Sequence, residues 1–255
     1  MKVLITGAAG FVGKNLISQL RLLAEPHEIL TYTKETTENI ESLLDQADFV
    51  FHLAGVNRPK DEKEFKEGNT DLTGTIVEHL TKTGKKAPLL ISSSIQAELD
   101  NPYGKSKLAA EDLVQEYSKA TGANCYIARL PNIFGKWSRP NYNSAVATFC
   151  YNLTHSLPVT INDASTPLNL IYIDDVASIF IDCLNGNTVP DDIANAIKSK
   201  TLTTTVGHAV NTLEQLVAIR KTLVVPDLSD KLTKCLYSTL TSFYDEQDLT
   251  ADLVV

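Results

Sequence analysis

The sequence has 255 residues, 43% of them hydrophobic, so the chain can bury a substantial core. Its formal net charge of −8 argues against a nucleic-acid-binding surface. The apolar run at the N-terminus is too short for a signal peptide, and no apolar run is long enough to cross a membrane, so we expect a cytoplasmic protein with no membrane partner. The four cysteines are widely spaced, and we expect them to be reduced thiols.

Residues 1–130 alternate apolar runs of strand length with segments whose apolar spacing is helical. The expected strands are 2–6, 27–33, 48–55, 87–94 and 124–130, and the expected helices are 11–24, 38–47, 69–84 and 102–117. Such alternation predicts βαβ units and a parallel sheet with helices on both faces. The expected fold class is therefore α/β, a doubly wound parallel sheet of the Rossmann type.

The pattern loosens after Arg129. We expect a loop at 131–145, a helix near 144–155, short strands near 159–161 and 168–173, and a helix from Asp175. Asn211, with Glu214 three residues later, is the expected cap of a further helix. The predicted domains are a cofactor-binding domain over 1–185 and a small, mostly helical substrate lobe over 186–255, placed at the strand ends where ligands bind in open α/β sheets.

The stretch "TGAAGFVG" places three glycines between the first strand and the first helix. Gly7 allows a tight turn, Gly10 lets backbone amides approach a pyrophosphate, and Gly13 lets the helix pack closely on the sheet. Strand, glycines and helix together predict a dinucleotide site, although a tight turn without a ligand has the same local requirements.

The end of the second strand indicates which dinucleotide binds. An NAD-binding chain usually carries an acid there for the ribose 2′-hydroxyl. Here Thr33 and Lys34 stand at that place, and Glu35 comes one or two positions late. Lys34 therefore favours the 2′-phosphate of NADP(H), unless it is a solvated loop lysine.

The heptapeptide "NPYGKSK" opens a helix, with Asn101 as N-cap and Pro102 at the first helical position. Tyr103 and Lys107 are then i and i+4 on one helix face. An ammonium beside a phenol favours the phenolate and makes the phenol a usable proton donor near neutral pH. The alternative is an ordinary exposed pair on a helix.

With "TGAAGFVG", "HLAGVNRP", "ISSS", "YGKSK", "RLPNIFG" and "YIDDVA" in order, residues 1–185 resemble the extended short-chain dehydrogenase/reductase family, which acts on nucleotide sugars. "SSSIQA", "NPYGKSKLAAE" and "PNIFGKWSRPNYNS" are similar to the N-terminal reductase domain of bifunctional capsular polysaccharide enzymes of the UDP-N-acetyl-L-fucosamine route. In those enzymes a C-terminal metal-binding cupin epimerises the sugar at C3. The likeness ends near residues 236–243, so we expect no cupin domain and, with no metal-ligand spacing among the histidines, no metal.

The resemblance implies that Tyr103 donates a proton to the substrate oxygen, that Lys107 binds the nicotinamide ribose, and that Ser94 polarises the carbonyl, with Ser93 as its rival. Tyr103 comes only nine positions after Ser94, so the loop between them is short and the pocket is expected to be more open there. The residues expected to bind the cofactor are Gly7, Gly10, Phe11, Val12, Gly13, Thr33, Lys34, Leu53, Ala54, Gly55, Ser92, Tyr103, Lys107 and Asn132. The residues expected to bind the substrate are Arg58, Ser93, Ser94, Asn132, Lys136, Arg139, Asn141, Tyr142 and Asn143. His52 is expected to be a core histidine with both nitrogens paired.

The resemblance therefore implies an NADPH-dependent homodimeric reductase of a UDP-linked 4-keto-6-deoxy-N-acetylhexosamine, giving UDP-N-acetyl-6-deoxy-L-talosamine for bacterial capsule synthesis. One alternative is an NAD-dependent nucleotide-sugar epimerase or dehydratase. Dehydratases of the family place an Asp-Glu pair after the catalytic hydroxyl, whereas Ile95 and Gln96 follow Ser94 here. The other alternative is a non-catalytic NADP-binding regulator, although such proteins usually lose the tyrosine or the lysine.

Overall fold

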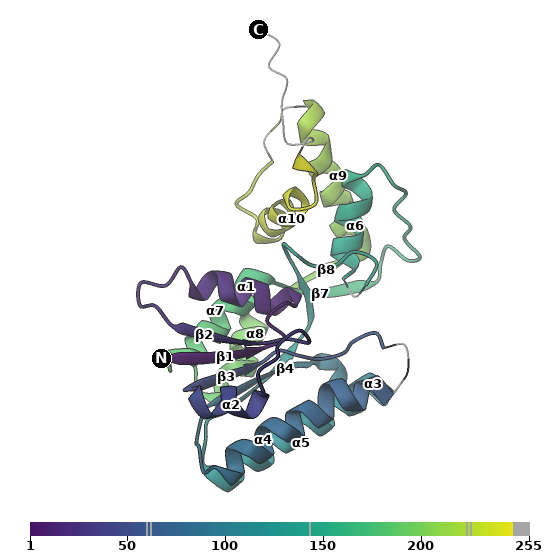
Figure 1. Cartoon of the computed structure of the whole chain (residues 1–255). Helices are drawn as coiled ribbons and strands as arrows, with labels where there is room; N and C mark the ends of the chain where they lie inside the picture. The colour runs from purple at the N-terminus through teal and green to yellow at the C-terminus, as the bar shows by residue number, and fades with distance from the viewer. Residues whose placement is uncertain (60, 62, 143, 223, 225, 247–255) are drawn as a thin grey trace. The chain divides into compact units, whose positions relative to one another are not determined.

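The structure is a computed structural model that describes residues 1–59, 61, 63–142, 144–222, 224 and 226–246 (Figure 1). It divides into two compact units. The first comprises Met1–Pro131 and Asp174–Lys200, and the second comprises Asn132–Ile173 and the chain from Thr201 onward. This division differs from the expected boundary at residue 185, because the segment 132–173 builds a sheet with a strand from the C-terminal part and so belongs to the second unit.

A five-stranded sheet forms the centre of the first unit, in the order β2-β1-β3-β4-β5. Its strands are β1 (Lys2–Thr6), β2 (Glu28–Tyr32), β3 (Phe49–His52), β4 (Leu89–Ser94) and β5 (Cys125–Leu130). Every neighbouring pair is parallel. The order starts in the middle of the sheet and runs outward in both directions, which confirms the doubly wound Rossmann-type α/β fold.

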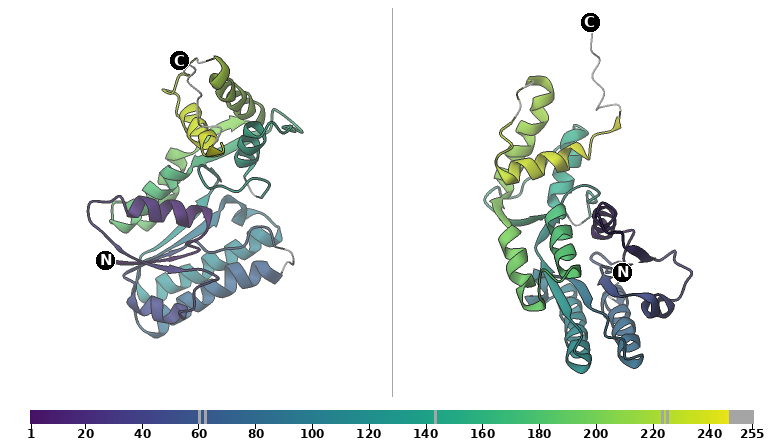
Figure 2. Two further views of the ribbon diagram at one scale, coloured as in Figure 1. Left: turned by 45° about the horizontal axis from the view of Figure 1, so that its top comes forward. Right: turned by 90° about the vertical axis from the view of Figure 1, so that its left-hand side faces the viewer.

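Helices cover both faces of this sheet (Figure 2). The helices of the first unit are α1 (Phe11–Leu20), α2 (Ile40–Gln46), α3 (Lys63–Phe65), α4 (Leu72–Lys82), α5 (Pro102–Thr121), α7 (Ile173–Leu184) and α8 (Ile193–Lys200), with short turns η1 (Lys66–Asp71, π-helical), η2 (Ile95–Glu98) and η3 (Pro190–Asp192). Buried side chains of α2, α4 and α5 form one core with β1, β3 and β4. On the other face, the Phe180 ring of α7 lies 6.0 Å from the Phe51 ring of β3.

The second unit contains a three-stranded sheet, β6-β7-β8, made of β6 (Asn132–Phe134), β7 (Pro167–Tyr172) and β8 (Leu202–Thr205). Its helices are α6 (Ala145–Thr154), α9 (Val206–Thr222) and α10 (Lys231–Thr241). Two expectations were wrong here. Residues 159–161 form no strand, and α9 begins at Val206, where the Thr205 hydroxyl accepts from His208 N at 3.2 Å, so Asn211 lies inside the helix and does not cap it.

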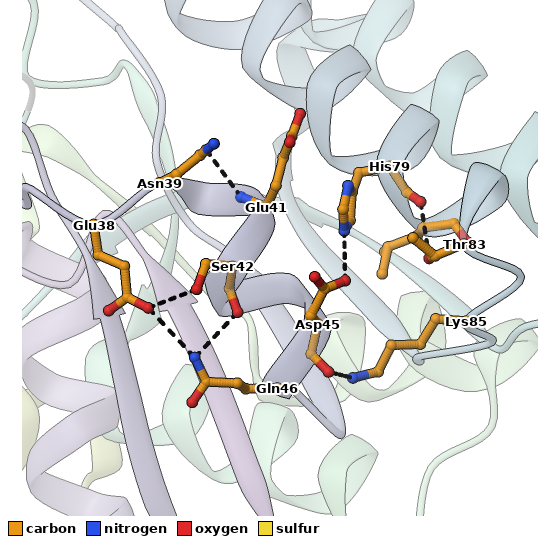
Figure 3. A network of polar contacts seen from close by, with 10 residues as sticks. Glu38, Asn39, Glu41, Ser42, Asp45, Gln46, His79, Thr83 and Lys85 are labelled. Atoms are coloured by element: carbon orange, nitrogen blue, oxygen red, sulfur yellow. Dashed lines mark hydrogen bonds and ion pairs between the residues drawn. The ribbon is translucent and has the colours of Figure 1, made fainter.

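A polar network joins α2 to α4 (Figure 3). The Asn39 side chain accepts from Glu41 N at 3.1 Å and caps α2. Asp45 accepts from two sides, with His79 Nε2 2.7 Å from its carboxylate and the Lys85 ammonium on its backbone carbonyl. Asp45 precedes β3 and Lys85 precedes β4, so the network stands at the edge of the sheet where these strands begin. In open α/β sheets ligands bind at the opposite end, where the parallel strands finish.

Helix α5 begins where the sequence predicts. The Asn101 side chain accepts from Gly104 N at 2.7 Å, and Pro102 occupies the first helical turn. The helix ends at Gly122, whose φ of 73° is the left-handed conformation typical of a helix C-terminus. Between these ends the buried residues of α5 include Lys107, Glu111 and Val114.

Replacing the cap of α5 tests this start. Asn101→Ala leaves a first-turn amide without its acceptor, so we expect the free energy of unfolding to fall by about 1 kcal/mol. Asn101→Asp keeps an acceptor and should retain most of the stability. Urea unfolding followed by circular dichroism measures both variants, and an unchanged midpoint in Asn101→Ala would contradict the cap.

Candidate active site

The glycine loop packs directly against the end of β3. Gly7 has a φ of +67°, and a Cβ at this position would lie 2.6 Å from Ala54 N. A Cβ on Gly13 would lie 2.4 Å from Gly7 O. Both positions therefore require glycine, because neighbouring backbone atoms lie too close for a Cβ. At Gly7 the positive φ is a second reason.

The start of α1 can hold an anion. Gly10 is its N-cap and provides no side-chain cap, and no acidic residue stands in the first turn. The amides of Phe11, Val12 and Gly13 have no acceptor within the helix, because the first N–H groups of any α-helix lack one. Unpaired amides and the helix dipole favour negative charge, so this helix start fits the pyrophosphate of a dinucleotide.

A directional chain of hydrogen bonds holds the segment after β3. Ala54 N donates to Thr6 Oγ1 at 3.1 Å, and this hydroxyl lies 2.7 Å from His52 Nδ1. Thr73 Oγ1 donates to Asn69 O at 2.6 Å, so its lone pair must accept from His52 Nε2, 2.9 Å away. His52 is thus a neutral imidazole with its proton on Nε2, and burial lowers its pKa to about 3. The expectation of a paired core histidine is confirmed.

Asn69 fixes the next residues of the same segment. Its side chain is buried, accepts from Val56 N at 2.8 Å and donates to Val56 O at 3.0 Å and to Ser106 Oγ at 3.0 Å. Asn69 lies in the π-helical turn η1, within the stretch expected to be ordinary α-helix. Sequence reasoning missed this residue, because helical periodicity does not reveal a π-helical turn.

Lys107 connects the glycine-loop side of the site to Tyr103. Its side chain is buried, and Nζ donates to Ser92 O at 3.0 Å and lies 6.0 Å from the centroid of the Tyr103 ring. A Cβ on Gly55 would come within 3.1 Å of the same nitrogen. Burial lowers the pKa of Lys107 to about 8, opposed by the nearby charge of Glu111. Lys107 therefore retains its ammonium at neutral pH.

Tyr103 is half-buried and packs against an aromatic ring that the sequence analysis did not select. The centroid of the Phe65 ring in α3 lies 5.7 Å away, with the two planes at 51°. Phe65 precedes the π-helical turn that contains Asn69. The same short segment therefore restrains both the tyrosine and the backbone beside Lys107.

The structure separates the two candidate serines. Ser93 is buried and donates its hydroxyl to Glu111. Neighbouring side chains of a strand point to opposite faces, so Ser92 and Ser94 face away from Glu111. Ser94 is half-buried and caps η2, where its oxygen accepts from Gln96 N at 3.2 Å. Ser93 is thus engaged inside the protein, at odds with its expected contact to a substrate, and Ser94 remains the candidate that polarises a carbonyl.

Both an acid and a cation stand after β2. The Thr33 hydroxyl donates to a Glu35 carboxylate oxygen at 2.8 Å, and this hydrogen bond lowers the pKa of Glu35. Lys34 is exposed. The turn thus offers a carboxylate suited to a 2′-hydroxyl and an ammonium suited to a 2′-phosphate.

Most of the expected substrate residues belong to the second unit. Asn132 opens β6, and the loop from β6 to α6 carries Lys136, Arg139, Asn141 and Tyr142. In this loop Arg139 lies 5.6 Å from the centroid of the Tyr142 ring. Asn143 falls outside the described residues, and Arg58 is an exposed residue of the first unit.

The part of the chain that the structure describes offers neither a helix fit to span a membrane nor a cluster fit to hold a metal ion. No helix there is both long and apolar enough to cross a membrane. No three His, Cys, Asp or Glu residues within it are grouped as a metal ion would require.

The model of the NAD dependent epimerase/dehydratase family matches residues 3–195. The chain belongs to this family. It is 44% identical over 259 residues to the UDP-2-acetamido-2,6-beta-L-arabino-hexul-4-ose reductase of Pseudomonas aeruginosa, an alignment that covers 99% of this chain and 68% of the relative. It is accordingly an enzyme of the short-chain dehydrogenase/reductase type.

Two solved structures have the same fold. The capsular polysaccharide assembling protein CapF from Staphylococcus aureus superposes with a TM-score of 0.87 at 40% identity, covering 98% of this chain and 68% of that one. The UDP-glucuronic acid 4-epimerase of Bacillus cereus, solved in complex with NAD, superposes with a TM-score of 0.77 at 18% identity, over 95% and 98% of the two chains. At that identity the second match shows the fold alone.

The neutral His52 predicts a loss of stability in acid. Its pKa is about 3 in the folded state against an ordinary value of 6.5, so the unfolded chain takes up a proton first as the pH falls. The contribution of His52 to stability is complete above about pH 6.5 and is lost towards pH 3, with a slope of up to about 1.4 kcal/mol per pH unit.

His52→Gln should remove this part of the pH dependence, since a glutamine side chain takes up no proton. Urea unfolding at a series of pH values between 4 and 8 measures it. His79→Gln, at the Asp45 contact between α2 and α4, is the control for histidine loss elsewhere in the unit. Parallel stability curves for wild type and His52→Gln would refute the neutral assignment.

Proposed function

We propose that the chain is an NADPH-dependent reductase acting at the C4 ketone of a UDP-linked 4-keto-6-deoxy-N-acetylhexosamine. The observation that carries this proposal is the meeting of Tyr103, Lys107 and Gly55 within one unit that also contains the glycine loop. The reductase name of the relative that is 44% identical supports the substrate class.

Reduction of a ketone needs a hydride at carbon and a proton at oxygen, and NADPH supplies the hydride when bound. The amides of Phe11 and Val12 would hold its pyrophosphate. Lys107 would bind the nicotinamide ribose and favour the ionised form of Tyr103, so that the phenol gives up its proton readily. Tyr103 would then protonate the C4 oxygen, while the Ser94 hydroxyl donates a hydrogen bond to that oxygen.

The substrate would be held by polar residues of the loop before α6 and by Arg58. The cations Lys136 and Arg139 suit a diphosphate, and the amides Asn132 and Asn141 suit sugar hydroxyls. Asn143 and Tyr142 complete the proposed set. The proposed product is UDP-N-acetyl-6-deoxy-L-talosamine, a precursor for capsular polysaccharide, and the proposed assembly is a homodimer.

One observation favours a second candidate, a redox-neutral epimerase that keeps NAD bound. The Glu35 carboxylate beside Thr33 is the kind of group that accepts from a ribose 2′-hydroxyl. The two functions differ in cofactor consumption, because a reductase oxidises one NADPH for each product and an epimerase oxidises none overall.

The deciding experiment mixes the purified chain with NADPH and a panel of UDP-4-keto sugars. With the 4-keto-6-deoxy-N-acetyl sugar, we expect the nicotinamide absorbance to fall as the sugar is consumed. NMR of the product should then show reduction at C4. Turnover of a nucleotide sugar without loss of NADPH absorbance would establish the epimerase.

Replacing the phenol removes the proposed proton donor. Tyr103→Phe should lower kcat about 10²–10⁴-fold, the usual contribution of general acid catalysis, with little change in NADPH affinity. Tyr117→Phe is the matched control, because this buried tyrosine of the same helix donates to Lys85 O and Ala87 O and should affect stability instead. Steady-state kinetics and a cofactor titration separate the two effects, and substantial turnover in Tyr103→Phe would exclude it as the acid.

The turn after β2 predicts the cofactor preference. NADPH should bind at least about tenfold more tightly than NADH, a difference of about 1.4 kcal/mol. Lys34→Ala should shrink this preference by removing a cation, whereas Glu35→Gln should widen it by removing a negative charge from the same turn. Fluorescence titration with both cofactors measures each ratio, and equal affinities in the wild type would disprove the role of Lys34.

A further inference from the structure

Glu111 is a fully buried acid that the proposed chemistry does not use. It lies on α5 one turn after Lys107, and its side chain has no exposed surface. A buried carboxylate is strongly unfavourable unless it is paired and hydrogen-bonded. Its partners therefore indicate why it is there.

Both carboxylate oxygens of Glu111 are occupied by groups from the sheet. The Ser93 hydroxyl donates to Oε1, Arg129 Nε lies 3.0 Å from both oxygens, and Arg129 Nη2 donates to Oε2 at 2.6 Å. Ser93 and Arg129 are directly paired in the register of β4 and β5. Arg129 Nη1 also donates to Glu98 Oε1 at 2.9 Å, so the network joins α5, both strands and η2.

Resting on the proposed reductase function, we propose that Glu111 is a positioning residue for Lys107: it fixes the end of β4 that Lys107 binds, and its charge favours the ammonium form. The first part follows from adjacency. Ser93, held by Glu111, directly follows Ser92, whose carbonyl accepts from Lys107 Nζ. One carboxylate therefore anchors the helix that carries the lysine to the strand that carries its acceptor.

The second part follows from the charges around Lys107. Burial, and to a smaller extent the Lys107 charge, lower the pKa of His52 on β3, so this neighbour is neutral. Asn69 of η1 and Lys107 both border Gly55, and Tyr103 lies one turn before Lys107 on α5. Burial opposes the ammonium, and the Glu111 carboxylate is the charge that opposes this effect. Arg129 offsets part of the Glu111 charge, so the Glu111–Arg129 pair sets how strongly the ammonium is held.

The test measures the titration of Lys107 directly, in the full chain without substrate. Carbon-13-labelled lysine gives an NMR signal whose shift reports the charge on Nζ, and Lys107→Arg assigns it. Glu111→Gln should lower the midpoint of Lys107 by about one pH unit, since it removes an adjacent opposite charge but keeps hydrogen-bonding capacity.

Two further variants make the result specific. Arg129→Gln should raise the midpoint, because it removes a like charge and leaves the carboxylate. Ser93→Ala, which removes one hydrogen bond but no charge, should leave the midpoint within about 0.3 pH unit of wild type, below the effect expected for a charge. If Glu111→Gln does not fold, the direction in which the Lys107 midpoint moves in Arg129→Gln decides whether the proposal holds.

Unchanged midpoints in Glu111→Gln and Arg129→Gln, or a fall in Arg129→Gln, would overturn the proposal. In a working reductase, the alkaline limb of the kcat/KM profile should move to lower pH in Glu111→Gln, following the Lys107 midpoint. The NMR measurement needs no turnover. If the chain reduces no 4-keto sugar but the Lys107 midpoint shifts as described, the proposed reductase function is wrong and the positioning role of Glu111 stands.

Discussion

A buried lysine ammonium is the constraint on which the site depends. Removing a charge from water is unfavourable by several kcal/mol unless neighbouring groups replace the lost hydration. For Lys107 these neighbours are the Ser92 carbonyl, 3.0 Å from Nζ, and the Glu111 charge one helical turn away. The backbone at Gly55 also comes so close that a Cβ there would lie 3.1 Å from Nζ. Strand, helix and loop must therefore all keep their places for one side chain to remain charged.

Two networks of different character meet around this lysine. On the β3 side, a chain of hydrogen bonds runs from the amide of Ala54 through His52 to the carbonyl of Asn69. The donor and the acceptor of each bond in it are assigned, and His52 in the middle is neutral. On the β4 side, the Glu111–Arg129 pair carries opposite charges. A neutral chain fixes positions without competing for the proton of Lys107, whereas a charged pair acts on it through its field. The neutral chain therefore fixes the backbone around Lys107, and the charged pair acts on its ammonium.

Local patterns predicted the elements that local sequence determines. The strand–glycine–helix unit at Gly7 and the cap at Asn101 depend on residues a few positions apart, and both were found. The partners of His52 were not, because Thr6 and Thr73 lie 46 and 21 residues away in the sequence. The sequence could not resolve the choice between Ser93 and Ser94, because helices cover both faces of the sheet: Ser93 shares the strand face of Leu89 and Ile91, Ser94 shares that of Leu90, and all three apolar residues are buried. The acid that separates the two serines, Glu111, lies 18 residues from Ser93 in the sequence.

The short connection between Ser94 and Tyr103 shows how a departure from the family pattern is accommodated. A shortened loop suggested an open pocket, but η2 packs directly on the first turn of α5. A Cβ on Gly104 would lie 2.3 Å from Gln96 O and 2.5 Å from Leu99 O. Glycine beside the tyrosine thus lets the loop approach the helix, and Glu98 ties the same loop to Arg129. The short connection is thus packed against Gly104, the residue that follows the proposed proton donor, while the centroid of the Phe65 ring lies 5.7 Å from that of Tyr103.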